Sequence, residues 1–371
     1  MAATSPEGPL VFVGTYTHGA SEGIYVFRLD PSSGALERVS VATGIENPTF
    51  LAVDAAGRSL YAASTVMECE GRPSGTVSAH RIDADAGRLE FLSRRFSRGT
   101  KPCHVVVDRT GRFVLAANYG SGSVCVLPIM EDGRLGEASA FAQHEGSSVH
   151  PERQTGPHAH SINLDPQNRY AFAPDLGTDR VMAYRFDART GGLTPNDSPW
   201  AEVAPGSGPR HFDFHPGGRW AYLINEIGNT VTAFAYDAAR GALEEIQTVP
   251  TLPEGFGGDS ACAHVQVSPS GRFLYGSNRG HDSIVIFAID GGTGRLTYVG
   301  HEPTRGEGPR HFSLDAAGRL MLVANGATDS IVAFRVDDRT GRLAPTGSVT
   351  QVPSPVCVLI LPRPEAGQGA G

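Results

Sequence analysis

Long hydrophobic runs are missing from this sequence of 371 residues. No apolar stretch approaches the roughly 18 residues that a helix needs to cross a bilayer, so a protein with membrane-spanning helices is excluded. The first ten residues, MAATSPEGPL, have neither the basic start nor the apolar core of a secretory signal peptide. We therefore expect a cytoplasmic protein.

Cysteine is scarce, and its pattern is wrong for a disulfide framework. There are five cysteines, an odd number, and no two of them form a Cys-x-x-Cys motif. Small disulfide-stapled proteins have even numbers of cysteines at close spacings. The thiols therefore also favour a reducing compartment such as the cytoplasm.

The sequence also lacks an excess of positive charge. Lys and Arg total 31 against 39 Asp and Glu, which gives a formal net charge of −8. This sign is wrong for a protein that binds nucleic acid or an anionic membrane through its overall field. We expect neither as a partner, although a local basic pocket for a small anion is compatible with the balance. The sequence makes no prediction about oligomeric partners.

Turn-forming residues are abundant, with 46 glycines and 26 prolines. Such frequent punctuation leaves little room for long helices. Hydrophobic residues make up 40% of the chain, and charged residues 19%, which is enough apolar surface for a packed core. The composition predicts a folded protein built from short elements.

A repeat of about fifty residues runs through the chain. Its clearest mark is Gly-x-Leu after an alternating apolar run, and it occurs seven times, at Gly34, Gly87, Gly133, Gly191, Gly241, Gly294 and Gly341. A turn ending in Gly-Arg or Asn-Arg precedes six of these marks, with its arginine at positions 58, 112, 169, 219, 272 and 319. Repeats of this length are typical of propellers and other repeat architectures.

Each repeat has the pattern of four strands. Residues 262–300 show it best, as the runs CAHVQVS, RFLYGSN, SIVIFAID and LTYVGHE. Each run is short, rich in β-branched or aromatic residues, and bounded by turn residues. Four strands repeated seven times predict an all-β protein, a seven-bladed β-propeller with four-stranded antiparallel blades.

The two ends of the chain predict how the ring closes. The first repeat lacks an innermost strand and opens with LVFVGTYT, whereas SPVCVLILP from Ser354 is a strand without a repeat of its own. We expect the C-terminal strand to join the N-terminal blade, which removes an exposed sheet edge. Residues 8–362 are thus predicted to form one domain, with flexible tails at 1–7 and 363–371.

Two columns of residues are predicted to meet at one mouth of the central channel. In a propeller the innermost strand begins, and the next strand ends, on the same face of the ring. At these positions most blades carry Asn, His or small residues, which turns and backbone hydrogen bonds explain. The blades differ, however, at five polar residues, His160, Arg210, Glu226, Arg279 and Arg310.

These five residues can be interpreted in two ways. They form either a network of ion pairs between blades or a binding site for an anion. Two guanidinium groups can grip a planar carboxylate or phosphate, which lysine cannot match. Glu226, held ionised by arginines, can accept a proton, and His160 can relay it or donate to an oxyanion. His211, directly after Arg210, and His264, at the equivalent position of the next blade, are further candidate substrate-binding residues.

At these residues the sequence resembles the seven-bladed propeller lactonases, a family that includes bacterial 6-phosphogluconolactonases and fungal 3-carboxy-cis,cis-muconate lactonizing enzymes. The most specific stretches are HPERQTGPHAHSINLDP (150–166), GPRHFDFHP (208–216), INEIGNTV (224–231) and SNRGHDSI (277–284). They occur in this order along the chain.

The resemblance implies a lactone site formed by His160, Arg210, Glu226 and Arg279 as catalytic residues. His158 is the alternative to His160 within PHAH. It also implies that Arg153 and Gln154, in the loop before the fourth blade, close over the site. Together with His158, His211, His264 and Arg310, they are the candidate substrate-binding residues. No cofactor is implied. Two alternating histidines, His158 and His160, are also too few ligands for a metal site.

The function that the resemblance implies is hydrolysis of a small anionic lactone, first of all 6-phosphoglucono-1,5-lactone of the pentose phosphate pathway. Arg310, Lys101 and His281 are the candidate contacts for its phosphate. One alternative is a cycloisomerase that closes a carboxylated muconate into a lactone. The other is a non-enzymatic interaction propeller, against which stand the missing Trp-Asp repeat endings and the polar residues at the mouth.

Overall fold

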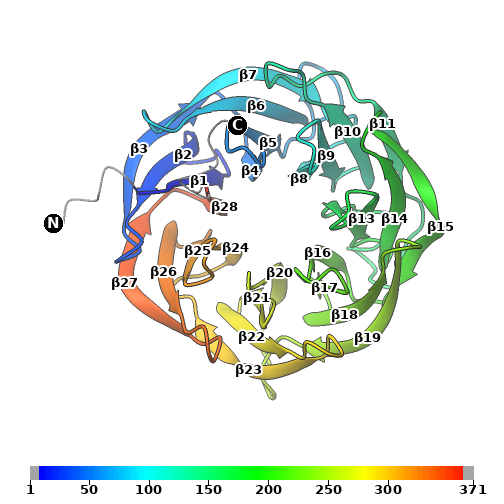
Figure 1. Cartoon of the computed structure of the whole chain (residues 1–371), viewed down its shortest axis with the longest axis vertical. Helices are drawn as coiled ribbons and strands as arrows, with labels where there is room; N and C mark the ends of the chain where they lie inside the picture. Colours follow the sequence, from blue (N-terminus) through cyan, green and yellow to red (C-terminus); the bar gives the residue numbers. More distant parts are fainter. Residues whose placement is uncertain (1–7, 362–371) are drawn as a thin grey trace, which may run out of the picture.

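Seven four-stranded antiparallel sheets surround a central axis in the computed structural model, which describes residues 8–361 (Figure 1). The predicted seven-bladed propeller is confirmed, and there is no helix among residues 8–361. Consequently, nothing within these residues forms a helix able to cross a membrane. The predicted flexible tails at 1–7 and 363–371, and position 362 at the end of the predicted domain, lie outside the described residues.

Each blade runs from an innermost strand at the channel to an outermost strand at the rim. In that order, blade 1 consists of β28 (Pro355–Ile360), β1 (Leu10–Thr15), β2 (Gly23–Leu29) and β3 (Leu36–Thr43). Blade 2 consists of β4 (Pro48–Val53), β5 (Ser59–Ser64), β6 (Thr76–Asp83) and β7 (Arg88–Phe96). Blade 3 consists of β8 (Pro102–Val107), β9 (Phe113–Asn118), β10 (Ser123–Pro128) and β11 (Ala140–Gln143). Blade 4 consists of β12 (Asn163–Leu164), β13 (Tyr170–Asp175), β14 (Arg180–Asp187) and β15 (Gly192–Glu202).

The remaining three blades are regular. Blade 5 consists of β16 (Pro209–Phe214), β17 (Trp220–Asn225), β18 (Thr230–Asp237) and β19 (Ala242–Pro250). Blade 6 consists of β20 (Ala261–Val267), β21 (Phe273–Arg279), β22 (Ser283–Ile289) and β23 (Leu296–Pro303). Blade 7 consists of β24 (Pro309–Leu314), β25 (Leu320–Asn325), β26 (Ser330–Val336) and β27 (Leu343–Gln351).

The ring closes through pairing of the last strand with the first. β28 is antiparallel to β1, with Val358 opposite Val13, and the amide of Tyr16 donates to the carbonyl of Ser354 at 3.2 Å. This confirms the predicted closure by the C-terminal strand. Because β1 is paired on both sides, the closure leaves no unpaired edge on β1.

The repeated Gly-Arg turn has a conformational cause. In blade 3, Oδ1 of Asp108 accepts hydrogen bonds from the amides of Arg112 and Phe113, both at 2.8 Å. The turn needs a left-handed residue just before the arginine. Gly111 (φ 68°) supplies it in this blade, and Asn168 (φ 59°) in the Asn-Arg version. Glycine and asparagine tolerate this conformation best, which is why the motif recurs.

The glycine of the repeated Gly-x-Leu motif lies where two neighbouring blades are in contact. A Cβ on Gly294 of blade 6 would lie 2.6 Å from the indole of Trp220 in blade 5, so only glycine fits. Buried apolar clusters fill each of the seven junctions between neighbouring blades. The ring is therefore a rigid frame, and it holds the residues at its mouth in fixed positions.

Candidate active site

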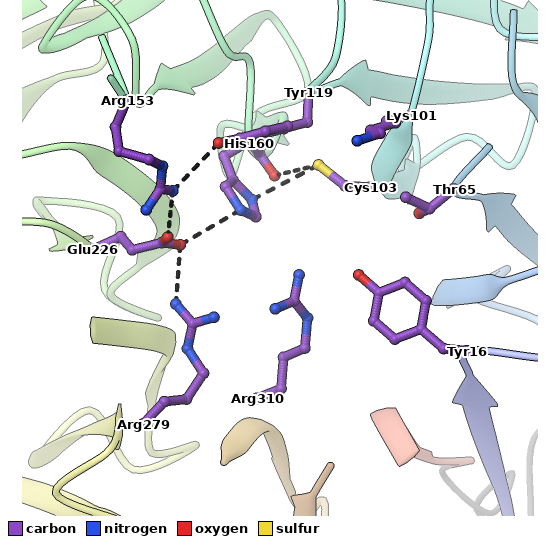
Figure 2. A pocket seen from close by; sticks show the side chains of 10 residues that line it. All are labelled: Tyr16, Thr65, Lys101, Cys103, Tyr119, Arg153, His160, Glu226, Arg279 and Arg310. Atoms are coloured by element: carbon purple, nitrogen blue, oxygen red, sulfur yellow. Dashed lines mark hydrogen bonds and ion pairs between the residues drawn. The ribbon is translucent and has the colours of Figure 1, made fainter. Parts of the chain in front are cut away.

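One mouth of the ring contains a cavity of about 440 Å³ to which all seven blades contribute (Figure 2). The residues that line it are Tyr16, Thr65, Lys101, Cys103, Tyr119, Arg153, His160, Glu226, Arg279 and Arg310. Seven of them lie in the two predicted columns, near the start of an innermost strand or at the end of a second strand: Thr65, Cys103, Tyr119, His160, Glu226, Arg279 and Arg310. Of the four predicted catalytic residues, His160, Glu226 and Arg279 face this cavity.

Glu226 is the only carboxylate among the lining residues, and three guanidinium groups surround it. Its Oε1 accepts a hydrogen bond from Arg153 at 2.7 Å, and its Oε2 accepts from Arg210 at 2.8 Å and lies 3.1 Å from Arg279. Burial alone would raise the pKa of Glu226, but the charges of Arg279 and Arg210 outweigh it and hold the pKa well below its usual range. Glu226 is therefore ionised at any physiological pH.

Arg210 lies behind Glu226 and does not line the cavity. Its side chain is only 2% exposed, and it also donates to the carbonyl of Ala263. Burial lowers its pKa to about 9, with the neighbouring charges of Arg279 and Arg310 acting in the same direction and Glu226 opposing them. The prediction put Arg210 among the catalytic residues. In the structure its guanidinium contacts Glu226 and the carbonyl of Ala263 and is not among the residues that line the cavity.

His160 is the histidine of PHAH that faces the cavity. Its Nε2 lies 3.7 Å from Oε2 of Glu226, and its Nδ1 lies 3.7 Å from the thiol of Cys103. Burial and the charge of Arg210 hold the pKa of His160 well below its usual value, although Glu226 acts in the opposite direction. The imidazole is therefore neutral and able to accept a proton.

The loop before blade 4 carries Arg153 to the rim, and Asp175 anchors it. One carboxylate oxygen of Asp175 lies 2.6 Å from Nδ1 of His144, and the other accepts from the amides of His158 at 2.8 Å and Gly177 at 3.0 Å. Arg153 then reaches across to Glu226 and, at 3.3 Å, to the hydroxyl of Tyr119. The side chain of Arg153 is 40% exposed and can move when a ligand enters.

Two predicted substrate-binding residues, Gln154 and His158, support this loop and do not line the cavity. Gln154 is fully buried, donates to the carbonyl of Leu176 at 2.9 Å and accepts from the amide of His150 at 3.0 Å. His158 stacks on the ring of Tyr119, with centroids 4.6 Å apart, and its Nδ1 bonds the Tyr119 carbonyl at 2.9 Å. Their polar groups are used within the protein, so the structure gives them positioning roles.

The predicted substrate-binding residues His211 and His264 lie deeper in the channel. Their Nδ1 atoms are 2.8 Å apart, and with His104, His311 and Phe50 they form a packed cluster of rings. Burial is the main reason that the pKa values of all four histidines are lowered. Within residues 8–361 no group of three or more His, Cys, Asp and Glu side chains is placed to hold a metal ion.

Some lining residues were not selected from the sequence. Thr65, Tyr119 and Cys103 stand in the two columns but were not picked out, because their side chains carry no charge. Tyr16 is the blade 1 member of the same column as Glu226. It was missed because the columns were counted from the turn arginine, which blade 1 lacks. Aligning GTY at 14–16 with ANY at 117–119 would have found it.

Known proteins with similar sequences and structures share this architecture. Residues 10–360 match the family described as "Lactonase, 7-bladed beta-propeller". A Bacillus subtilis protein named 6-phosphogluconolactonase is 40% identical over 350 residues, which is 94% of this chain and 97% of that protein. A Formosa agariphila protein of the same name is 35% identical and covers 82% of this chain and 86% of its own length. Among solved structures, the Pseudomonas aeruginosa periplasmic gluconolactonase superposes with a TM-score of 0.90 at 35% identity, covering 96% of this chain and 99% of that one.

Proposed function

The chain belongs to the seven-bladed β-propeller lactonase family, and on that basis we propose that it hydrolyses 6-phosphoglucono-1,5-lactone to 6-phosphogluconate in the pentose phosphate pathway. The observation that carries the proposal is the cluster at the channel mouth. There, one ionised carboxylate and one neutral imidazole face a cavity whose other charged lining residues are cations. Two relatives named 6-phosphogluconolactonase support this substrate.

The charge of the cavity favours an anionic substrate. Arg153, Arg279, Arg310 and Lys101 line it, Arg210 lies behind it, and Glu226 is the one opposing charge. A site of this sign in a protein of net charge −8 attracts a small anion locally, where the overall field would repel it. A phosphorylated sugar lactone carries such a charge.

In the proposed reaction His160 is the general base. Three guanidinium groups neutralise Glu226, which makes its carboxylate a weak proton acceptor. His160 is neutral, and in the tautomer that carries its hydrogen on Nδ1, beside the Cys103 thiol, its Nε2 takes a proton from water. Glu226, 3.7 Å from Nε2, then stabilises the imidazolium that forms.

The arginines stabilise the charge that develops on the substrate. As the water oxygen attacks the lactone carbonyl carbon, the carbonyl oxygen becomes an oxyanion. The exposed guanidinium groups of Arg279 and Arg153 are placed to bind it. When the bond between the carbonyl carbon and the ring oxygen breaks, His160 returns its proton to the ring oxygen, and the open acid is released.

The experiment compares the loss of 6-phosphoglucono-1,5-lactone with its spontaneous hydrolysis, for the wild type and for His160→Gln and Glu226→Gln. We expect wild-type turnover, and a loss of about 10²–10⁴-fold in kcat for His160→Gln, the usual contribution of a general base. Glu226→Gln loses activity through disordered arginines and an unsupported imidazolium. Glu244→Gln, an exposed carboxylate on β19 of the same blade as Glu226, is the control that retains activity.

Two outcomes contradict the proposal. If the wild-type protein does not hydrolyse the lactone faster than the spontaneous reaction, the proposed hydrolase function is wrong. Turnover of a muconate substrate, followed by ultraviolet absorbance, then tests the cycloisomerase alternative. Full activity in His160→Gln removes His160 from the role of base.

We also propose a cytoplasmic location. The five cysteines are all free, and none is paired with another, which suits a compartment that keeps thiols reduced. Fractionation of cells of the source organism tests this, and recovery of the protein with periplasmic markers contradicts it.

A further inference from the structure

Two cations of the cavity have no counter-charge. Arg153, Arg210 and Arg279 all pair with Glu226, but Arg310 and Lys101 have neither a carboxylate partner nor a hydrogen-bond acceptor among residues 8–361. The one contact of the Arg310 guanidinium is with the ring of Tyr16, whose centroid lies 5.7 Å from its Cζ. Unpaired cations that face a cavity mark a place where a ligand supplies the missing negative charge.

These cations lie away from Glu226 on the ring. Glu226 belongs to blade 5, and the two blades farthest from it around a ring of seven are blades 1 and 2, which contribute Tyr16 and Thr65. Arg310 of blade 7 and Lys101 at the start of blade 3 flank that pair. In Figure 2, Tyr16, Thr65 and Lys101 lie across the cavity from Glu226 and Arg279, and Arg310 points into the space between. The cavity therefore has two halves of different chemistry.

The backbone at Lys101 is an independent sign of selection. The residue just before the proline that opens an innermost strand is left-handed in five blades. These residues are Asn47 (φ 45°), Lys101 (φ 50°), Gly208 (φ 67°), Gly308 (φ 67°) and Ser354 (φ 48°). Glycine and asparagine suit this conformation, whereas a long side chain is held there at a cost. Lys101 thus places a long, cavity-lining side chain at a position that asparagine or glycine fills in three of the other four blades.

Among the hydroxyl groups of this half, that of Tyr16 is available. The hydroxyl of Thr65 already donates to the carbonyl of Pro102 at 2.6 Å, whereas the Tyr16 hydroxyl has no partner among the described residues. The third candidate phosphate contact from the sequence, His281, does not line the cavity. Its Nδ1 bonds the Ser283 hydroxyl at 2.6 Å, and its ring packs against Phe256. A cavity half with two free cations and one free hydroxyl suits a group with several acceptor oxygens.

We propose that Arg310, Lys101 and the Tyr16 hydroxyl bind the phosphate of the substrate, and that they make the enzyme prefer a phosphorylated lactone to the plain sugar lactone. This inference rests on the proposed lactonase function. The phosphate is carried on the exocyclic carbon, several bonds from the carbonyl carbon, so the two ends of one substrate occupy the two halves. With the phosphate between Arg310 and Lys101, the carbonyl lies toward His160, Arg279 and Glu226.

The experiment measures kcat and KM for 6-phosphoglucono-1,5-lactone and for glucono-1,5-lactone with wild type, Arg310→Met, Lys101→Met and Tyr16→Phe. Loss of one charge-assisted contact to phosphate is expected to raise KM for the phosphorylated lactone about 10- to 100-fold in Arg310→Met. The ratio of kcat/KM between the two lactones then falls by at least about tenfold, because the plain lactone has no phosphate to lose. Arg319→Met, an exposed arginine on the far turn of the same blade, is the matched control and keeps the wild-type ratio.

Binding of the products, 6-phosphogluconate and gluconate, is measured by calorimetry in parallel, so the inference stands or falls independently of turnover. A preference of the wild type for 6-phosphogluconate that disappears in Arg310→Met supports it even if neither lactone is hydrolysed, a result that removes only the proposed function. Two results contradict the proposed phosphate site. One is that Arg310→Met weakens the binding of both products, or of both lactones, by the same factor. The other is that the wild type does not prefer the phosphorylated ligands. Arg310→Lys, which keeps the charge, is expected to recover part of the preference and covers the case in which the methionine variant is unstable.

Discussion

Glu226 holds the mouth of the ring together, because three arginines from three different segments meet on its two oxygens. The three pairs are not equivalent. The side chains of Arg210 and Glu226 are 2% and 7% exposed, so water does little to screen their interaction, whereas Arg153 is 40% exposed. Removing one partner of a buried pair leaves an uncompensated charge, while exposed pairs contribute little to stability. The arginines therefore have separable roles.

Arg210→Met is expected to lower the free energy of unfolding by about 3–5 kcal/mol, the usual cost of breaking a buried pair. The exposed Arg153→Met is expected to lower it by no more than about 1 kcal/mol. Both variants should lose lactonase activity, because both remove a support of Glu226. Urea unfolding measures the change in stability, and initial rates measure the loss of lactonase activity. Equal stability losses would show that Arg210 is not a framework residue.

At these positions the sequence predicts which residues belong to the site better than it predicts where their side chains point. The columns led to His160, Glu226, Arg279 and Arg310, all of which line the cavity. They could not show that Arg210 turns behind Glu226, because direction depends on the acceptor that packing supplies, in this case the carbonyl of Ala263. Gln154 and His158 were also misjudged. Both were predicted to bind substrate, but Gln154 bonds the carbonyl of Leu176 and His158 that of Tyr119, contacts distant in the sequence that no local pattern records.

The loop of residues 144–162, between β11 and β12, is the irregular element that completes the site. Asp175, at the end of β13, receives hydrogen bonds from both ends of this loop, and Asp179 accepts from the hydroxyl of Ser148 at 2.5 Å. The ring frame thus fixes the loop at several points. The innermost strand of blade 4 is correspondingly short, and before it the backbone meets β13 only at an isolated bridge between Ala159 and Asp175.

Asp175→Asn is expected to weaken this anchor, since an amide replaces the carboxylate that faces His144 at 2.6 Å. Arg153 is then less well placed, and KM should rise by about three- to tenfold, which corresponds to roughly 1 kcal/mol of lost interaction. Steady-state kinetics measures the change in KM, and hydrogen exchange measures how firmly the loop is anchored. The control is Asp237→Asn, at an exposed turn of blade 5. An unchanged exchange rate in the loop would show that Asp175 is not the anchor.

The strands themselves were the most predictable feature of the chain. Gly-Arg turns and Gly-x-Leu marks are local requirements of backbone conformation and blade contact, so the sequence displays them once per blade. The loop of residues 144–162 was not predictable in the same way. It occurs once, and its shape depends on carboxylates of another segment.

The closed ring makes the whole molecule depend on one strand. Val358 of β28 is fully buried and packs with Val13 and Leu322 at the junction of blades 1 and 7. Val349 on the outer strand β27 is 54% exposed. The two valines are close in sequence, but only Val358 packs in the core at the junction that closes the ring.

Val358→Asp is expected to lower the free energy of unfolding by about 4 kcal/mol or more, because a charge replaces a core side chain at the closure. Val349→Asp should change it by less than about 0.5 kcal/mol, as for ordinary surface substitutions. Thermal and urea unfolding of both variants measure the difference. Similar stability for the two would contradict closure through β28.

The histidine cluster in the channel predicts acid sensitivity of the whole ring. Burial lowers the pKa of His104 and of His311 to about 3, and it also lowers the pKa of His211 and His264 well below the usual value. Between pH 6.5 and 3 the unfolded chain therefore binds protons that the folded chain excludes, and stability falls as the pH falls. Asp213 acts in the opposite direction, because burial raises its pKa to about 7.

His264→Phe, which copies the phenylalanine that blade 2 has at the equivalent position, is expected to flatten this dependence. Each excluded proton contributes about 1.4 kcal/mol per pH unit below the unfolded pKa. The slope of unfolding free energy against pH between 6 and 4 should fall by about that amount in the variant. Urea titrations at a series of pH values provide the measurement. An unchanged slope would mean that His264 is protonated in the folded protein.

The pairing of β1 with β28 also governs how the protein is made. Ribosomes deliver β1 before any other strand of the ring, and its inner partner β28 only after all the others. Until then the nascent first blade exposes an unpaired edge, the kind of surface that recruits neighbouring chains into aggregates. Contacts between such distant parts of a chain also form slowly. Because the last strand completes the ring, we expect expression of the protein to depend on chaperones. We also expect a synthetic peptide of β28 to rescue a chain that lacks this strand.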